Sequence, residues 1–170
     1  MDSRSSATRA KASSKHAVKK SVGEKECKAK MLKLLSIRDY SISNMRGKLA
    51  DSGFGEDDID GAIDFAVESG LMDDSRYAEA FIASKKELGW GRGRIERALD
   101  DRGVDCGELE DYPDAFFPQD EELERAKRCL RSHRTSAKNA RESHYRYLLS
   151  KGFSTYIASR AIRECMGELE

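Results

Sequence analysis

The chain has 170 residues, of which 38% are hydrophobic and 36% are charged, so its core is modest relative to its surface. This balance argues against one large globular core and favours a series of small units. Two prolines, many strong helix formers and few alternating apolar segments predict an all-α fold. No segment approaches the roughly 18 consecutive apolar residues of a membrane helix, so we expect no membrane contact.

The formal net charge is zero, yet the charges are segregated along the chain. Residues 49–75 carry nine acidic and no basic side chains, and residues 103–124 repeat that count. Residues 125–163 hold eleven basic side chains and one acid, Glu142. A merely solvated surface mixes charges of both signs, so this segregation favours a binding surface.

The first segment of the chain, residues 1–25, is predicted to be a basic, disordered arm. It consists largely of Ser, Ala, Lys and Arg and has almost no large apolar side chain. Such a segment cannot offset the entropy cost of ordering. Two roles remain open for it: a weak, non-specific contact with nucleic acid, or a solubilising tail.

Three helical units are predicted to follow, over residues 26–72, 73–118 and 119–170. Gly53, Gly103 and Gly152 each follow a predicted helix, and they are spaced by 50 and 49 residues. A period of this length is typical of stacked helical repeats. We therefore expect three tandem three-helix, helix-turn-helix-like repeats that form an elongated, curved array.

In the first repeat, Ser41 is expected to cap the second helix, and the third helix should place Ile59, Ile63 and Val67 in the core. In the third repeat, three helices are expected to bury apolar side chains. These are Leu123, Ala126, Cys129 and Leu130, then Tyr145, Leu148 and Leu149, then Ile157, Ala161, Ile162 and Cys165.

The second repeat begins with a predicted helix that is capped by Asp74 or Ser75 and ended by Gly89. The next helix should bury Ile95, Ala98 and Leu99 and direct Arg94 and Arg97 outward. A third helix is opposed by Gly107, Pro113 and Pro118, so we expect a short helix at most. Phe116 and Phe117 are expected to replace part of the missing packing by docking on a neighbouring unit.

No catalytic or metal-binding pattern in the sequence favours an enzyme. Three histidines, no Gly-rich phosphate loop and no nucleophile elbow leave little for catalysis, and we expect no cofactor. Cys129, His133, His144 and Cys165 could share a metal, but they lack the closely spaced ligand pairs of structural zinc sites. We expect no metal, and cysteines that are reduced in a cytoplasmic setting.

Clusters of basic residues are the remaining functional candidates, because the planar fork of arginine suits phosphate and carboxylate groups. We expect a partner- or DNA-binding surface made of two groups of residues. They are Lys85, Lys86, Arg92, Arg94 and Arg97 around a Gly-Trp-Gly turn, and Arg131, Arg134, Lys138 and Arg141 further on. Trp90 could anchor an interface or pack in the core, and core packing is favoured.

One long motif in the middle of the chain resembles the RecX family, regulators of the recombinase RecA. The matching positions are Asp73, Asp74, Arg76, Tyr77, Phe81, Gly89-Trp90-Gly91, Arg94, Ile95, Leu99 and Gly103, with Gly152 and Phe153 in the third repeat. The resemblance extends from about residue 26 to the C-terminus, and it implies three tandem three-helix units.

The resemblance also implies a function. It implies an inhibitor or modulator that lies along the RecA–DNA filament and limits its extension, ATP turnover and strand exchange, without catalysis of its own. Separately, we expect the chain to be a monomer. Weak, non-specific DNA contact is compatible with that role. An alternative from another class is a free-standing helix-turn-helix DNA-binding protein, which would prefer particular duplex sequences and show a steep salt dependence.

Overall fold

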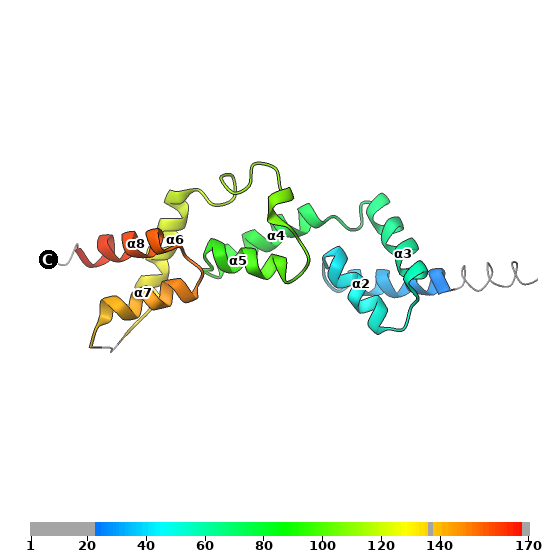
Figure 1. Cartoon of the computed structure of the whole chain (residues 1–170), viewed down its shortest axis with the longest axis horizontal. Helices are drawn as coiled ribbons and strands as arrows, with labels where there is room; N and C mark the ends of the chain where they lie inside the picture. Colours follow the sequence, from blue (N-terminus) through cyan, green and yellow to red (C-terminus); the bar gives the residue numbers. More distant parts are fainter. Residues whose placement is uncertain (1–22, 136–137, 168–170) are drawn as a thin grey trace, which may run out of the picture. The chain divides into compact units, whose positions relative to one another are not determined.

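The computed structural model describes residues 23–135 and 138–167, and over these residues the chain contains helices and no β-strand (Figure 1). The prediction of an all-α protein built from three-helix repeats is confirmed. Most of the predicted basic arm, residues 1–22, lies outside the described residues. The chain divides into two compact units, the first ending at Tyr77 and the second beginning at Ala78. Within the described ranges, no helix is long and apolar enough to span a bilayer.

The first unit contains a helix over residues 23–35, then α2 (Ile42–Asp51) and α3 (Glu56–Glu68). The hydroxyl of Ser41 accepts a hydrogen bond from the backbone N–H of Asn44 at 3.2 Å, which confirms the predicted cap. The buried core is a single cluster. It consists of Cys27, Met31, Met45, Leu49, Ile59, Ala62, Ile63, Ala66 and Met72.

The predicted core position of Val67 is wrong, because this side chain is 46% exposed. The buried stripe of α3 runs instead through Ile59, Ile63 and Ala66, at the helical spacing of i, i+4 and i+7. Val67 follows Ala66 by one position and is therefore turned away from the stripe. Alanine was too small to be recognised as core from the pattern alone.

The second repeat consists of α4 (Asp74–Glu87), α5 (Arg92–Asp100) and a single 3₁₀ turn, η1 (Cys106–Glu108). The predicted loss of its third helix is confirmed. The cap of α4 differs from the prediction, because Asp73 rather than Asp74 or Ser75 accepts the hydrogen bonds. Its carboxylate accepts from the N–H groups of Ser75 and Arg76, at 2.9 and 3.1 Å.

The third repeat consists of α6 (Gln119–Ser132), α7 (Ala140–Ser150) and α8 (Thr155–Gly167). Helix α6 packs mainly on α8, and α7 also packs on both (Figure 1). The buried cluster between them is Leu123, Ala126, Leu130, Leu148, Phe153, Ile157, Ala158, Ala161 and Ile162. Most of these positions match the predicted core of this repeat.

The glycines that were predicted to end the repeats' helices adopt the backbone conformation that this role requires. Gly53, Gly103 and Gly152 have φ values of +88°, +69° and +91°. Residues with a Cβ rarely adopt this region, which is why glycine is favoured there. Phe117 is buried beneath the Lys86 ammonium, whereas Phe116 lies against Tyr112.

Candidate binding interface

The Gly89-Trp90-Gly91 turn between α4 and α5 forms a junction between the second and third repeats. The N–H of Gly91 donates to the carbonyl of Lys151 at 2.8 Å, and the N–H of Gly93 donates to the carbonyl of Gly152 at 3.0 Å. From α6, the thiol of Cys129 donates to the carbonyl of Gly89 at 3.4 Å. Both ends of the turn are therefore hydrogen-bonded to the third repeat.

The glycines of this junction allow two backbones to meet directly. A Cβ added to Gly91 would collide with the backbone of Gly152 and Phe153. Likewise, a Cβ added to Gly152 would collide with the backbone and Cβ of Arg94. The glycine-aromatic-glycine motif therefore has a structural reason, which is the close contact between α5 and the α7–α8 turn.

Carboxylates from the following helix cap the second helices of the first two repeats. Glu122 is 6% exposed, and its Oε1 accepts a hydrogen bond from the N–H of Arg92, the first residue of α5, at 3.1 Å. Asp74 plays the equivalent part in the first unit, where its Oδ1 accepts from the N–H of Ile42 in α2 at 2.9 Å. Each carboxylate belongs to the first helix of the following repeat, so it links neighbouring repeats as well as capping a helix.

A buried arginine completes the junction. Arg125 is 6% exposed, and its Nε donates to the carbonyl of Trp90 at 3.1 Å. Burial lowers the pKa of Arg125, while the negative charge of nearby Glu122 opposes that shift. Its guanidinium also lies over the ring of Phe153. Arg125 is therefore part of the packed junction and is not a surface cation.

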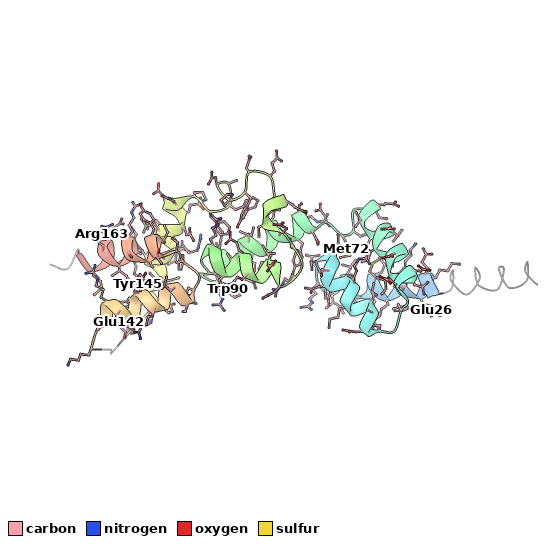
Figure 2. The ribbon with its side chains drawn as sticks, viewed as in Figure 1. Glu26, Met72, Trp90, Glu142, Tyr145 and Arg163 are labelled. Carbon is pink, nitrogen blue, oxygen red and sulfur yellow. The ribbon has the colours of Figure 1, made fainter. Side chains whose placement is uncertain are left out.

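Trp90, for which core packing was favoured over an interface role, lies partly buried at the α4–α5 turn (Figure 2). The guanidinium carbon of Arg94 lies 3.9 Å from its ring centroid, and the Lys85 ammonium lies 5.3 Å away. These distances are typical of cation–π contacts, so Trp90 holds two of the predicted binding residues against the protein.

Two further members of the first predicted group also have partners within the chain. The ammonium of Lys86 lies 3.6 Å from the carboxylate of Glu121. The Nε of Arg92 donates to Glu96 at 2.7 Å, and this hydrogen bond raises the pKa of Arg92. Among these five cations, Arg97 alone is exposed and has no partner within the described part of the chain.

The second predicted group is different in its surroundings. Its members lie at the end of α6, in the following loop and at the start of α7, and all are exposed. With Arg128 they form what we call the α6–α7 basic end, namely Arg128, Arg131, Arg134, Lys138 and Arg141. None of the five forms an ion pair within the described ranges.

The α6–α7 basic end is a connected region and not only a sequence block. The hydroxyl of Thr135 donates to that of Ser143 at 3.0 Å, and the rings of His133 and His144 lie 5.3 Å apart. These contacts hold the end of α6 close to the start of α7. Burial and the proximity of His133 lower the pKa of His144. His144 therefore becomes protonated only at a lower pH than an ordinary histidine.

Other cations of the third repeat are neutralised locally. Lys127 pairs with Glu164 at 3.2 Å, and Arg160 pairs with the same carboxylate at 2.9 Å. Arg146 pairs with Glu142 on α7. The exposed positive charge of this repeat is therefore concentrated at the α6–α7 basic end and at Arg163 of α8. The sequence pattern included Arg128 and Arg163 only as members of a basic block, because it does not show which cations are paired.

Within the described residues, no group of three or more His, Cys, Asp or Glu side chains could hold a metal ion. His133 lies between His144 and Tyr147, with its ring centroid 3.9 Å from that of Tyr147. Burial raises the pKa of the neighbouring Cys129 thiol, which disfavours the thiolate that metal binding needs.

These features define a class: tandem helix-turn-helix-like repeats, the second and third joined by close backbone contacts, with an exposed cationic surface on the third repeat. Two family models match, described as the RecX first three-helix domain over residues 27–65 and the RecX second three-helix domain over residues 73–109. The chain belongs to the RecX family, whose members are named as regulatory proteins.

Similar proteins support this assignment over most of the chain. "Regulatory protein RecX" of Ectopseudomonas mendocina (strain ymp) is 30% identical over 136 residues, which cover 78% of this chain and 89% of that protein. The protein of that name from Vibrio vulnificus (strain CMCP6) is 34% identical over 133 residues, covering 75% and 85%. The crystal structure of RecX from Lactobacillus salivarius shares the fold, with a TM-score of 0.74 at 22% identity, covering 85% of this chain and 97% of that one.

Proposed function

We propose that this chain regulates the RecA recombinase by binding the RecA–DNA filament. In this proposal it limits filament extension, ATP hydrolysis and strand exchange, and so modulates recombination and DNA repair without catalysing a reaction itself. Membership of the RecX family supports a regulatory role.

The observation that carries the proposal is the α6–α7 basic end, with five exposed cations that form no ion pair within the described residues. A filament of protein on DNA presents anionic groups at regular intervals along its length. Cations that are already neutralised would have to give up an ion pair within the chain to bind such a target. Exposed cations without an ion pair have no such interaction to give up. We therefore place the main contact on the third repeat, with Arg97 as a contribution from the second.

Tandem repeats suit such a polymeric target because each repeat adds a contact. Linked contacts raise the overall affinity by about 10² to 10⁴ when the geometry allows simultaneous binding. A single repeat would then bind weakly, and the complete chain tightly. The separate repeats need not contribute equally to the affinity.

The alternative, a free-standing helix-turn-helix DNA-binding protein, is disfavoured for the second repeat. In such proteins the start of the second helix enters the major groove. Here the start of α5 is covered, because Gly91 and Gly93 donate hydrogen bonds to the α7–α8 turn. A sequence-reading role for α5 would require this junction to open.

A charge-matched pair of variants tests the proposal. One variant carries Arg131→Ala, Arg134→Ala and Arg141→Ala, and the control carries Lys127→Ala, Arg146→Ala and Arg160→Ala. Both lose three positive charges from the same repeat, but only the control residues are ion-paired. We expect the first variant to lose at least tenfold in inhibition of RecA-dependent ATP hydrolysis on single-stranded DNA, and the control to change little.

Two outcomes would contradict the proposal. Equal losses in both variants would show that net charge matters and that this surface does not. Tight, sequence-dependent binding to duplex DNA, without any effect on RecA-dependent ATP hydrolysis, would favour the helix-turn-helix alternative.

A further inference from the structure

A small hollow lies between α7 and α8, next to the α6–α7 basic end. Its volume is about 290 Å³, and it is lined by Asn139, Arg141, Glu142, Tyr145, Ser159 and Ile162. Figure 2 labels Tyr145 and Glu142 on α7 and Arg163 on the neighbouring α8. This volume lies at the lower end of ligand pockets, which span roughly 300–1,000 Å³, so it suits a single ring system.

The inner wall of this pocket is apolar and fixed in place. Ile162 is 2% exposed and belongs to the buried cluster of the third repeat. Tyr145 is partly buried and packs against the same cluster, so its ring is held by packing while one part remains accessible. A fixed, accessible aromatic ring beside an aliphatic side chain favours a flat ligand.

The rim of the pocket is cationic. Arg141 lines it, and Arg163 lies four residues after the lining residue Ser159, on the same face of α8; both are exposed. The one acid of the lining, Glu142, is neutralised by an ion pair with Arg146 and accepts a hydrogen bond from the side chain of Asn139. A flat apolar site with unpaired cations around it matches a ligand that has a planar ring and a negative charge on either side.

We propose that this pocket receives one unstacked base of single-stranded nucleic acid, with the flanking phosphates on Arg141, Arg163 and Lys138. The inference rests on the proposed function and extends it, because it makes the third repeat the part of the chain that contacts DNA within the filament. Bases of a duplex are stacked on both faces and cannot enter such a site, whereas bases of a single strand can stack on an aromatic side chain.

An acidic segment of a protein is the competing occupant, and the lining argues against it. Carboxylates would be bound by the arginines alone and would gain little from Tyr145 and Ile162. A base uses both parts of the site, the ring and the cations. The aromatic residue is therefore the one whose removal separates the two occupants.

The test uses the complete chain and a thymidine oligonucleotide that carries one 2-aminopurine and a fluorescent end label. The key variant is Tyr145→Leu, which removes the ring but keeps apolar bulk against the core. Tyr156→Leu is the matched control, because Tyr156 is an exposed tyrosine of α8 that does not line this pocket. Tyr145→Phe keeps the ring and serves as a rescue.

We expect Tyr145→Leu to weaken binding to the single strand by about 5- to 100-fold and to abolish the change in 2-aminopurine fluorescence. Tyr156→Leu and Tyr145→Phe should each change affinity by less than about twofold. A duplex of the same length should bind more weakly to the wild type, and Tyr145→Leu should not weaken it further. Melting of each variant, followed by circular dichroism, confirms that the comparison is made between folded proteins.

The inference is overturned if the wild type shows no fluorescence change, or if folded Tyr145→Leu binds the single strand like the wild type. Retained inhibition of RecA together with either result would leave the proposed function standing and remove only the base site. A variant that binds naked single strands normally but no longer binds the filament would show that the pocket receives a segment of RecA instead.

To cover the case in which Tyr145→Leu fails to fold, Ser159→Leu fills the pocket from the exposed surface of α8 and leaves Tyr145 in place. The expected result is again a loss of single-strand affinity, with an unchanged melting temperature. Unchanged affinity in this folded variant would overturn the inference on its own.

Discussion

The basic groups of the second and third repeats are alike in sequence but differ in their surroundings. Around Trp90, most of the cations are held by rings or carboxylates of the same chain, as Arg94 is by Trp90 and Arg92 by Glu96. At the α6–α7 basic end, the cations are exposed and form no ion pair within the part of the chain that the structure describes. Density of basic residues along the sequence therefore does not measure the charge that is available to a partner.

The difference has a structural origin. The start of α5 lies in the junction between repeats, where two backbones approach closely and the surrounding side chains become part of the packing. The start of α7 is capped locally, because the side chain of Asn139 accepts a hydrogen bond from the N–H of Glu142. Equivalent helices of a repeat protein thus acquire different roles, one structural and one available for binding.

The largest expected effect comes from breaking the junction itself with Gly152→Ala. Positive φ costs a residue with a Cβ about 1–2 kcal/mol, and the collision with Arg94 adds about 1–3 kcal/mol. We expect a loss of about 2–5 kcal/mol in the free energy of unfolding of the second unit, measured by urea denaturation. Fluorescence of Trp90, the single tryptophan, should report the opening of the junction.

Gly53→Ala is the control for that variant, since Gly53 is the equivalent residue of the first repeat. It has a positive φ, but an added Cβ would meet nothing within 4 Å. The expected cost, measured on the first unit, is only about 1–2 kcal/mol. Equal losses at the two glycines would show that the close backbone contact contributes nothing.

The next effect tests whether a buried carboxylate links the repeats. Glu122→Ala leaves the N–H of Arg92 without its acceptor and removes a negative charge beside buried Arg125. We expect a loss of about 1–3 kcal/mol in the free energy of unfolding. Glu121→Ala, one residue away and exposed, should cost less than about 0.5 kcal/mol. A larger loss for Glu121→Ala than for Glu122→Ala would contradict the capping role of Glu122.

A smaller effect concerns pH and the contact between α6 and α7. The pKa of His144 is lowered in the folded state, so below its ordinary value of about 6.5 the unfolded chain binds more protons. The contribution of His144 to stability is therefore complete above pH 6.5 and is lost as the pH falls through its lowered pKa. Urea denaturation from pH 7.5 to 5 should show this decline, and His144→Gln should flatten it. If the stability of His144→Gln declined with falling pH as steeply as that of the wild type, His144 would not be the group responsible.

The smallest expected effect on stability belongs to the α6–α7 basic end. Arg131→Ala and Arg134→Ala remove exposed side chains without ion-pair partners in the described ranges, so each should change the free energy of unfolding by less than about 0.5 kcal/mol. Thermal denaturation checks this directly. A large destabilisation would mean that these arginines serve the fold, as those around Trp90 do.

Much of the fold could be predicted because its determinants are local. Ser41 as a cap, Gly53, Gly103 and Gly152 as helix stops, and the interrupted helix near Pro113 follow from nearby residues alone. Asp74 was expected only as a cap of its own helix, and Glu122 carried no expectation. Their additional role as caps for another repeat depends on contacts 30 or so residues away, which a local pattern does not contain.

The candidate site was less predictable for the same reason. The sequence showed which residues are basic, but it did not show that Trp90 and Glu96 hold Arg94 and Arg92. Nor could it distinguish Tyr145 as pocket lining from Tyr145 as core, since the same helical spacing fits both. Pairing and accessibility are properties of the folded repeat, and both decide which cations can bind.

The central claim is that cations of the third repeat, and not those around Trp90, carry the binding. The most direct test is the salt dependence of filament binding, measured by fluorescence anisotropy for wild type, for Arg131→Ala with Arg134→Ala, and for Lys85→Ala with Arg94→Ala. Each phosphate contact that is lost lowers the slope of log affinity against log salt by about 0.7–0.9. We predict a slope lower by about 1.4–1.8 for the first pair and an unchanged slope for folded protein of the second. A lower slope for Lys85→Ala with Arg94→Ala, and an unchanged slope for Arg131→Ala with Arg134→Ala, would contradict this claim.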